Sequence, residues 1–387
     1  MIKVLLVTSE PPLEPRNGIG RYVKDLKTTI SGELEIKVMS LMLDPHFPII
    51  LPENRIQMQP APWVDWSLRI DYDWFTESPE GRMWNSAHKV YPFVKVILND
   101  FKPDIIYLQS IKVWLPFRYE NNVIIAFHGL SRVINEKLAL DAYTAAIQRI
   151  EHEALIKAQS VVVFSQWMKK KLIDTYPTPQ SIAVLPIGVS KNFYFTGEKP
   201  KDIINVAFFG RINNSEKGCH SFLEAAHGIK SNGKYPEVHF HLYGEGEDND
   251  PADFPEVQFH GHVEGDDLIK AYQETHIVVV PSRQEPFGLV GLEAMAAGCL
   301  LLCPRGLGMD EYVSFGENAV EIESSAESIK QVLERMLENF EAYKDVIKSG
   351  ISTAASWDWE ETILEHCSLF NEIKNHLVEV AKSKHLD

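Results

Sequence analysis

The sequence predicts an α/β protein with two domains, each built around a parallel β-sheet. Short apolar runs alternate with helical segments along nearly the whole chain, which is typical of strands joined by crossover helices. A stretch rich in Gly, Pro, Lys and Asn at residues 187–202 divides these runs into two sets and indicates a linker. The chain of 387 residues is long enough for two or three domains with cores of their own.

The first set of elements predicts a domain over residues 1–190. It begins with a buried strand at residues 2–9, followed by a loop rich in Pro and Gly and by a helix from about Arg21. Further strands are expected at residues 35–40, 104–109, 123–127, 160–164 and 182–186.

The second set predicts a domain over residues 203–355. Its strands are expected at residues 204–210, 238–244, 257–261, 276–280 and 299–303, and its last helices at 325–340 and 341–355. Trp357 and Trp359 then precede a terminal amphipathic helix that ends near Lys382.

The charge and the cysteines exclude several classes of protein. With 38 basic against 54 acidic residues the net charge is −16, which argues against binding to nucleic acid or to an anionic membrane. No apolar run approaches the ~18 residues of a membrane span, so we expect a soluble, cytoplasmic protein. The four cysteines do not have the paired spacing of zinc ligands. Buried free thiols are therefore expected at Cys219, Cys299, Cys303 and Cys367.

The stretch PSRQEPFGLVGLEAMAAGCLLLCP, residues 281–304, constrains the function most tightly. Glu285 lies in a loop after a buried strand, and Glu293 lies inside a helix that Gly288 can begin without a steric penalty. A helix start presents free amide N–H groups and the positive end of the helix dipole. Two carboxylates beside such a start suit a ligand that carries both phosphates and hydroxyls. Taken alone, the glutamates fit an acidic first helical turn equally well.

This stretch resembles the signature of retaining glycosyltransferases with the GT-B fold, in particular glycosyltransferase family four, the glycosyl transferases group 1. The resemblance implies two Rossmann-like β/α/β domains with an interdomain cleft, and a C-terminal helix within residues 357–387 that crosses back to the first domain. It implies that the ribose of the nucleotide lies at Glu293. The residues implied at the donor sugar are Glu285, Phe287, Gly288 and Leu289.

A second motif follows the first strand of the second predicted domain. The segment GRINNSEKG, residues 210–218, resembles the family's Gly-Arg and Lys-Gly pair and places Arg211 and Lys217 at the donor diphosphate. A guanidinium and an ammonium there would stabilise the negative charge on the leaving group without a metal ion. Taken alone, the pair also fits two solvated loop charges.

Loops of the first predicted domain add weaker matches. Gly18 and Gly20 do not form the dinucleotide fingerprint, because Val23 stands where the third glycine would be, so a nicotinamide cofactor is not expected. In the family a glycine-rich turn at this place approaches the donor phosphate. The alternative is that the glycines only allow the loop a backbone with positive φ. His128, in the strand-ending segment FHG, matches a family histidine near the donor sugar and the reacting bond. Ser165 resembles a family position where a polar residue opens the next helix, and a helix N-cap alone would also explain it.

Other segments match the family in part. GEGE at residues 244–247 and GHVEGDD at 261–267 resemble the loops that border the nucleotide base. Where the family has Pro-Asn-Gly-Val-Asp, this chain has Pro186, Ile187 and Gly188 followed by Val and Ser, so no site residue is assigned there.

Together these features predict a retaining, metal-independent hexosyltransferase with no cofactor, acting as a monomer or homodimer. It would move a glucosyl, N-acetylglucosaminyl or mannosyl unit from a nucleotide diphosphate sugar, with UDP favoured, to an acceptor hydroxyl. Alternatives are a transferase for lipid-linked or cell-envelope glycan, a nucleotide-sugar 2-epimerase of the same fold, and a silent sugar-nucleotide-binding subunit. The residues expected to carry catalysis are His128, Arg211, Lys217 and Glu285.

The acceptor is expected at an aromatic and acidic segment, residues 63–81. Its aromatic faces suit sugar or cyclitol rings, and its carboxylates suit ammonium groups. Asp71, Asp73 and Trp74 are therefore expected to bind a polar acceptor such as an aminocyclitol or aminoglycoside. A packed loop with a solvated acidic edge is the alternative.

Overall fold

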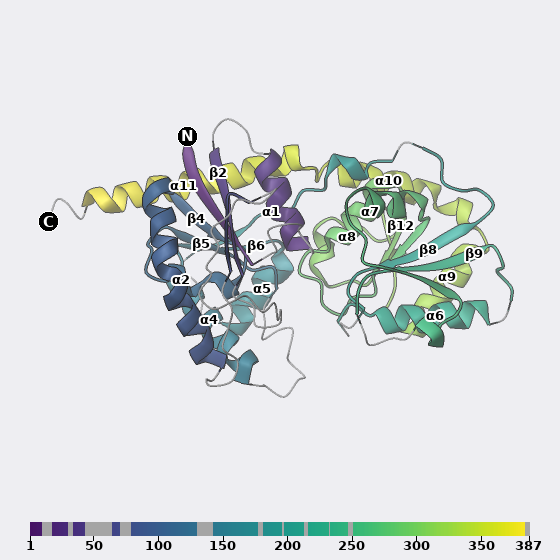
Figure 1. Ribbon diagram of the computed structural model, residues 1–387. Helices are drawn as coiled ribbons and strands as arrows, with labels where there is room; N and C mark the ends of the chain where they lie inside the picture. Colours follow the sequence, from purple (N-terminus) through teal and green to yellow (C-terminus); the bar gives the residue numbers. More distant parts are fainter. Residues whose placement is uncertain are drawn as a thin grey trace. The chain divides into compact units, whose positions relative to one another are not determined.

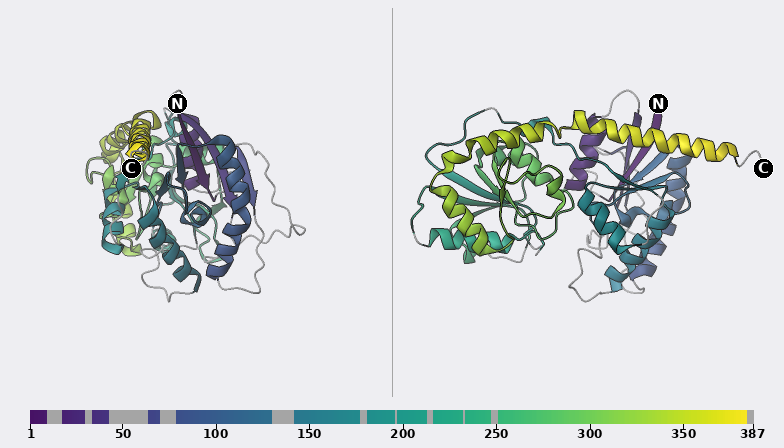
Figure 2. Two further views of the ribbon diagram at one scale, coloured as in Figure 1. Left: turned by 90° about the vertical axis from the view of Figure 1, so that its left-hand side faces the viewer. Right: turned by 180° about the vertical axis from the view of Figure 1, so that it is seen from behind.

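The computed structural model describes residues 1–9, 18–29, 34–42, 64–69, 79–129, 142–176, 181–195, 197–212, 216–231, 233–246 and 251–383. They form two compact units, which are drawn in Figure 1 and Figure 2. The first unit comprises residues 1–186 and 362–387, and the second comprises residues 187–361. Each unit is built on its own parallel sheet, which confirms the predicted fold class.

The sheet of the first unit has seven strands in the order β3-β2-β1-β4-β5-β6-β7. Its strands are β1 (Ile2–Thr8), β2 (Leu34–Met42), β3 (Trp66–Arg69), β4 (Ile105–Leu108), β5 (Val123–Ala126), β6 (Ser160–Val163) and β7 (Ile182–Val184). Strand β1 pairs in parallel with both β2 and β4, so the strand order reverses there. Loops that leave the carboxyl ends of strands at such a reversal commonly hold the ligand of an open α/β sheet.

Helices cover the sheet of the first unit. They are α1 (Gly18–Thr29), α2 (Pro79–Phe101), α4 (Ala142–Lys157) and α5 (Gln166–Thr175). Every residue of β4, β5 and β6 is buried, as expected for parallel strands with both faces covered. Ser165 caps α5, because its Oγ accepts a hydrogen bond from the amide N of Met168 at 3.0 Å. This capping role accounts for a serine at position 165, so no contact with a ligand is needed to explain it.

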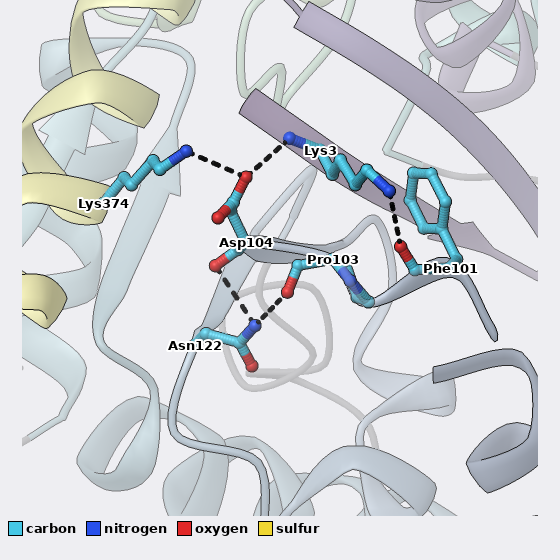
Figure 3. Close-up of polar contacts among 6 residues, drawn as sticks. All are labelled: Lys3, Phe101, Pro103, Asp104, Asn122 and Lys374. Atoms are coloured by element: carbon cyan, nitrogen blue, oxygen red, sulfur yellow. Dashed lines mark hydrogen bonds and ion pairs between the residues drawn. The ribbon is translucent and has the colours of Figure 1, made fainter. Parts of the chain in front are cut away.

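The terminal helix α11 (Trp359–Ser383) lies along the first unit from Thr362 onward, as Figures 1 and 2 show in yellow. Figure 3 shows its polar anchor: the Oδ2 of Asp104 accepts a hydrogen bond from the Nζ of Lys374 at 3.1 Å and another from the backbone N of Lys3 at 2.8 Å. The fully buried ring of Phe370 packs edge-on against Tyr107 with a centroid distance of 5.4 Å. The predicted return of the C-terminal helix to the first domain is thereby confirmed.

The segment that departs from the family pattern contacts the chain just before and at the start of α11. The backbone N of Val189 donates to the carbonyl of Trp357 at 2.8 Å. A Cβ on Gly188 would lie 2.6 Å from the indole ring of Trp359, so a side chain is excluded there. The ring of Trp357 contacts Phe287 at a centroid distance of 5.7 Å. Gly188 therefore has a packing role within the second unit.

The sheet of the second unit has six parallel strands in the order β10-β9-β8-β11-β12-β13. They are β8 (Ile204–Phe209), β9 (Val238–Tyr243), β10 (Val257–Gly261), β11 (Ile277–Val279), β12 (Leu300–Cys303) and β13 (Val320–Glu321). The helices are α6 (Cys219–Lys230), α7 (Gly265–Glu274), α8 (Leu289–Ala296), α9 (Ala326–Leu337) and α10 (Lys344–Ala355). Figure 1 shows α6 and α9 on one face of this sheet and α7, α8 and α10 on the other.

The sequence analysis missed β3 and β13. Both are short, and β3 carries a serine and an arginine inside the aromatic segment, so neither gives an apolar run. The cysteines are free; three are buried as expected, and Cys367 is half-buried. Within the described ranges, no helix is long and apolar enough to cross a membrane.

Candidate active site

Two loops at the carboxyl ends of β8 and β11 bring Lys217 and Glu285 together. The Nζ of Lys217 lies 2.6 Å from the Oε2 of Glu285, and the two side chains are 24% and 9% exposed. The Oγ of Ser282 donates to the same carboxylate oxygen at 3.3 Å. The structure thus joins one residue from each of the two strongest motifs in a half-buried salt bridge.

A close approach of backbones fixes the loop that carries Lys217. Gly218 has φ +71°, and a Cβ on it would lie 2.2 Å from the carbonyl oxygen of Pro281. The backbone N of Arg283 donates to the carbonyl of Glu216 at 2.6 Å. Since only glycine tolerates both the positive φ and the contact, the Lys-Gly pair sets the position of Lys217 beside the glutamate loop.

The start of α8 is equally crowded. Gly288 has φ +88°, and a Cβ on it would lie 2.4 Å from the Cγ of Met309 and 3.0 Å from the Cγ of Glu285. The hydroxyl of Tyr312 donates to the carbonyl of Gly288. Glycine at this position therefore lets α8 begin close to Glu285, and a helix start presents free amide groups and the positive end of the helix dipole.

Glu293 lies one turn inside α8 and is 1% exposed. The hydroxyl of Tyr272 donates to its Oε2 at 2.9 Å. The ring of Tyr272 is itself stacked on Phe209 with a centroid distance of 3.9 Å, so the donor is held firmly. The ribose role of Glu293 stays a prediction. Tyr272 was not found from the sequence, because nothing in the spacing links it to a glutamate on the next helix.

The other residues predicted at the donor belong to the same unit. Arg211 lies two residues after the end of β8 and is exposed, and Phe287 is buried against the ring of Trp357. Leu289 is the first residue of α8. A Cβ on Gly244 would lie 1.8 Å from the carbonyl oxygen of Gly210, so the protein's own backbone already requires glycine at the start of GEGE.

In the first unit, His128 follows β5 and is half-buried. Its Nε2 lies 3.0 Å from the Oε1 of Gln109, and its ring packs against Phe164 at a centroid distance of 4.6 Å. Burial lowers the pKa of His128 to about 3, so the imidazole is neutral near pH 7.

Gly18 and Gly20 belong to the first turn of α1. Gly18 is exposed, and a Cβ on it would meet nothing within 4 Å, so crowding within the described chain does not require glycine at this position. The predicted acceptor residues Asp71, Asp73 and Trp74 lie outside the described residues.

Comparisons with known proteins find similar sequences and similar folds. Residues 203–339 match the family model of the glycosyl transferases group 1. The D-inositol 3-phosphate glycosyltransferase of Segniliparus rotundus is 27% identical over 261 residues, which cover 61% of this chain and 57% of that protein. The match thus spans little more than half the length of this relative.

Solved structures resemble both units. Sucrose-phosphate synthase from Thermosynechococcus elongatus has a TM-score of 0.76 at 18% identity, over 96% of this chain and 99% of that chain. HepE from Anabaena, in complex with UDP-glucose, has a TM-score of 0.65 at 17% identity, over 99% and 100% of the two chains. At these identities the similarity shows the fold. Residues 203–339 are thus similar to the glycosyl transferases group 1, and the two units have the Rossmann-like folds of GT-B glycosyltransferases.

Proposed function

We propose that the protein transfers a hexosyl unit from a UDP-sugar to an acceptor hydroxyl, with retention of configuration at the anomeric carbon. The observation that carries this proposal is the contact between Lys217 and Glu285 at the start of α8, with 2.6 Å between Nζ and Oε2. It sets a cation, a carboxylate and a helix start side by side. A sugar linked to a diphosphate presents hydroxyls for the carboxylate and, close to them, negative charge for the cation and the helix start.

The chemistry follows from these groups. In the transition state the bond from the anomeric carbon to the diphosphate oxygen lengthens, and negative charge grows on the leaving phosphate. Lys217 and the exposed Arg211 would stabilise that charge, while Glu285 would accept hydrogen bonds from hydroxyls of the sugar. The acceptor oxygen would bond to the same face of the anomeric carbon and give its proton to the leaving phosphate. Catalysis would then depend on positioning and electrostatics rather than on a side-chain nucleophile.

The choice of UDP is supported by HepE, which is described in complex with UDP-glucose. A thermal-shift screen tests it, because a ligand at about 100 times its Kd adds about 2.7 kcal/mol to the free energy of unfolding. We expect UDP-glucose or UDP-N-acetylglucosamine to raise the melting temperature more than GDP-mannose or ADP-glucose. The donor site would be contradicted if no sugar nucleotide raised the melting temperature. Equal shifts with free UMP and with every sugar nucleotide tested would also count against it.

A polar, ring-shaped acceptor is supported by the relative named D-inositol 3-phosphate glycosyltransferase, whose name specifies a cyclitol phosphate. We propose a cyclitol or aminocyclitol. If Asp71 and Asp73 bind its ammonium groups, changing both to Asn should raise the acceptor KM about tenfold and leave kcat nearly unchanged. An unchanged KM for the amino-bearing acceptor, or better transfer to a lipid-linked phosphate at low salt, would exclude this acceptor class.

Metal independence is a separate prediction. Lys217, Arg211 and the start of α8 can balance the charge of a diphosphate, so a chelator should leave the rate of transfer largely intact. Both Asp-x-Asp triplets, at residues 71–73 and 248–250, lie outside the described residues. Loss of activity in EDTA, with recovery on adding Mg²⁺ or Mn²⁺ but not Na⁺, would refute the prediction.

The 2-epimerase alternative shares the nucleotide site, so binding experiments cannot separate it from transfer. Incubating the donor sugar nucleotide alone can, because an epimerase isomerises it without any acceptor. A transferase leaves the sugar unchanged or hydrolyses it slowly.

A further inference from the structure

The linker ends in a surface segment, residues 197–202, that has no regular secondary structure. Apart from Lys199 its residues are exposed. Two contacts hold this segment on the second unit. The Nζ of Lys199 donates at 3.1 Å to each of two backbone carbonyls in the last turn of α7. The carbonyl of Pro200 lies 2.8 Å from the Nε2 of His276, the residue before β11.

His276 lies between a backbone donor and a backbone acceptor. The backbone N of Asn205, near the start of β8, donates to Nδ1 at 3.1 Å. The Pro200 carbonyl can only accept, so Nε2 carries the proton of the ring. Because backbone groups cannot exchange these roles, both contacts require a neutral ring that is protonated at Nε2. A second proton, on Nδ1, would point at the amide N–H of Asn205 and break that contact.

The groups around this ring disfavour a second proton. Burial lowers the pKa of His276, the Pro200 carbonyl acts in the opposite direction, and the positive charge of Lys199 lowers the pKa further. The Nζ of Lys199 also lies 3.6 Å from the Sγ of Cys299, a thiol that stays neutral because burial raises its pKa. The ring of Phe340 meets the imidazole edge-on at a centroid distance of 6.1 Å. Among the described residues, no carboxylate forms an ion pair with His276 to balance a second proton.

A neighbouring pair of histidines does not have this restriction. The side chain of Asn205 donates through Nδ2 to the carbonyl of Glu274 at 2.8 Å, so its Oδ1 accepts from the Nε2 of His241 at 3.2 Å. The Nδ1 of His241 lies 3.0 Å from the Nε2 of His260. Since a ring nitrogen can donate or accept, this pair can take up one proton and keep its hydrogen bond.

We propose that His276 is an acid-sensitive latch for the linker. As a neutral ring it ties Pro200 to β8, and when it takes a second proton it releases residues 197–202 from the surface of the second unit. Two donors then face each other at Asn205, and the new cation repels Lys199, which lies on the segment that leaves. This inference is independent of the proposed function.

The sign of the pH dependence follows from the lowered pKa of His276 in the folded chain. A released histidine has the ordinary pKa of about 6.5. The stabilising contribution of the latch is therefore fully present above about pH 6.5, and it is lost as the pH falls from there toward the folded pKa. In this window the equilibrium constant for opening rises up to about tenfold for each pH unit, so from pH 7.5 to pH 5 we expect a rise of about 10- to 30-fold.

Limited proteolysis of the full chain measures the opening. The protease Glu-C cleaves after glutamate at both pH values, and Glu198 lies in the latched segment. Dividing the rate of cleavage after Glu198 by the rate for a free peptide of residues 194–204 removes the pH dependence of the protease itself. The divided rate should rise about 10- to 30-fold on going to pH 5. Cleavage after Glu334, inside α9, reports unfolding of the whole second unit and should stay slow at both pH values.

Two variants identify the histidine that responds. His276→Gln keeps a group that can donate to the Pro200 carbonyl but does not titrate, so its divided rate at pH 5 should stay within twofold of that at pH 7.5. His276→Asn, which keeps an acceptor for the amide of Asn205, is the second variant if His276→Gln folds poorly. His241→Gln is the matched control, because it removes the other histidine that contacts Asn205 and should keep the full response to acid.

NMR on the wild-type chain tests the proton position without any variant. A scalar coupling across the hydrogen bond from the Asn205 amide to Nδ1 identifies the ring, which should be protonated only at Nε2 at pH 7.5. A proton on Nδ1 at that pH overturns the latch. An equal rise in cleavage after Glu334, an unchanged rate after Glu198 at pH 5, or a response that persists in His276→Gln and disappears in His241→Gln overturns it as well.

Discussion

Replacing Lys217 by alanine is expected to lower kcat/KM by about 10²–10³-fold, the range seen when one preorganised donor to a developing oxyanion is removed. The ammonium lies 2.6 Å from the Oε2 of Glu285 and is only partly exposed. Among the described residues no other cation forms an ion pair with this carboxylate, so none can replace it. The measurement is steady-state transfer from the UDP-sugar selected by the thermal-shift screen.

The salt bridge complicates the interpretation, because Lys217→Ala also leaves a nearly buried carboxylate with Ser282 as its remaining described partner. A double-mutant cycle separates the two effects. Glu285→Gln in the Lys217→Ala background removes the unpaired charge and should restore stability, but it should not restore transfer. Recovery of activity in the double variant would mean that Lys217 serves only to neutralise Glu285.

Lys270→Ala provides a matched loss of a lysine. Its Nζ lies 3.8 Å from Glu274 one turn away on α7, and its side chain is 70% exposed, so activity and stability should stay near the wild type. Wild-type kcat/KM in Lys217→Ala would contradict the proposed diphosphate site.

The strands of both sheets could be predicted well because of how they are buried. A parallel strand covered on both faces is a continuous apolar run, and β4, β5 and β6 are buried at every residue. Strand β3 lacks this signal, since it has four residues with a serine and an arginine among them. Its place in the sheet comes from pairing with β2, which no local pattern encodes.

The candidate site was predictable only as separate motifs. The sequence places Lys217 before Gly218 and Glu285 after a strand, but their contact joins residues 68 positions apart and depends on the backbone contact of Gly218 with Pro281. The bond from Tyr22 to His366 joins residues 344 positions apart. Single tyrosines and histidines carry no spacing signal, so polar networks of this kind become visible only when the fold is known.

Gly288→Ala is expected to destabilise the second unit more than a substitution at another glycine of the same backbone conformation. Gly288 has φ +88° and Gly316 has φ +85°, yet a Cβ on Gly288 would lie 2.4 Å from the Cγ of Met309, whereas one on Gly316 would meet nothing within 4 Å. Gly316→Ala should therefore cost only the left-handed backbone penalty of about 1–2 kcal/mol. Gly288→Ala should cost about 1–3 kcal/mol more, because the core around Met309 must shift.

Thermal unfolding of the two variants measures this difference, and transfer activity adds a second readout. The added Cβ would also lie 3.0 Å from the Cγ of Glu285, so the loop that holds the carboxylate must move away from Lys217 and kcat/KM should fall. Met309→Ala opens a cavity on its own, but combined with Gly288→Ala it should cost less than the sum of the single changes, because the deleted side chain is the one that obstructs the new Cβ. Equal melting temperatures for Gly288→Ala and Gly316→Ala would show that backbone conformation alone requires glycine at the start of α8.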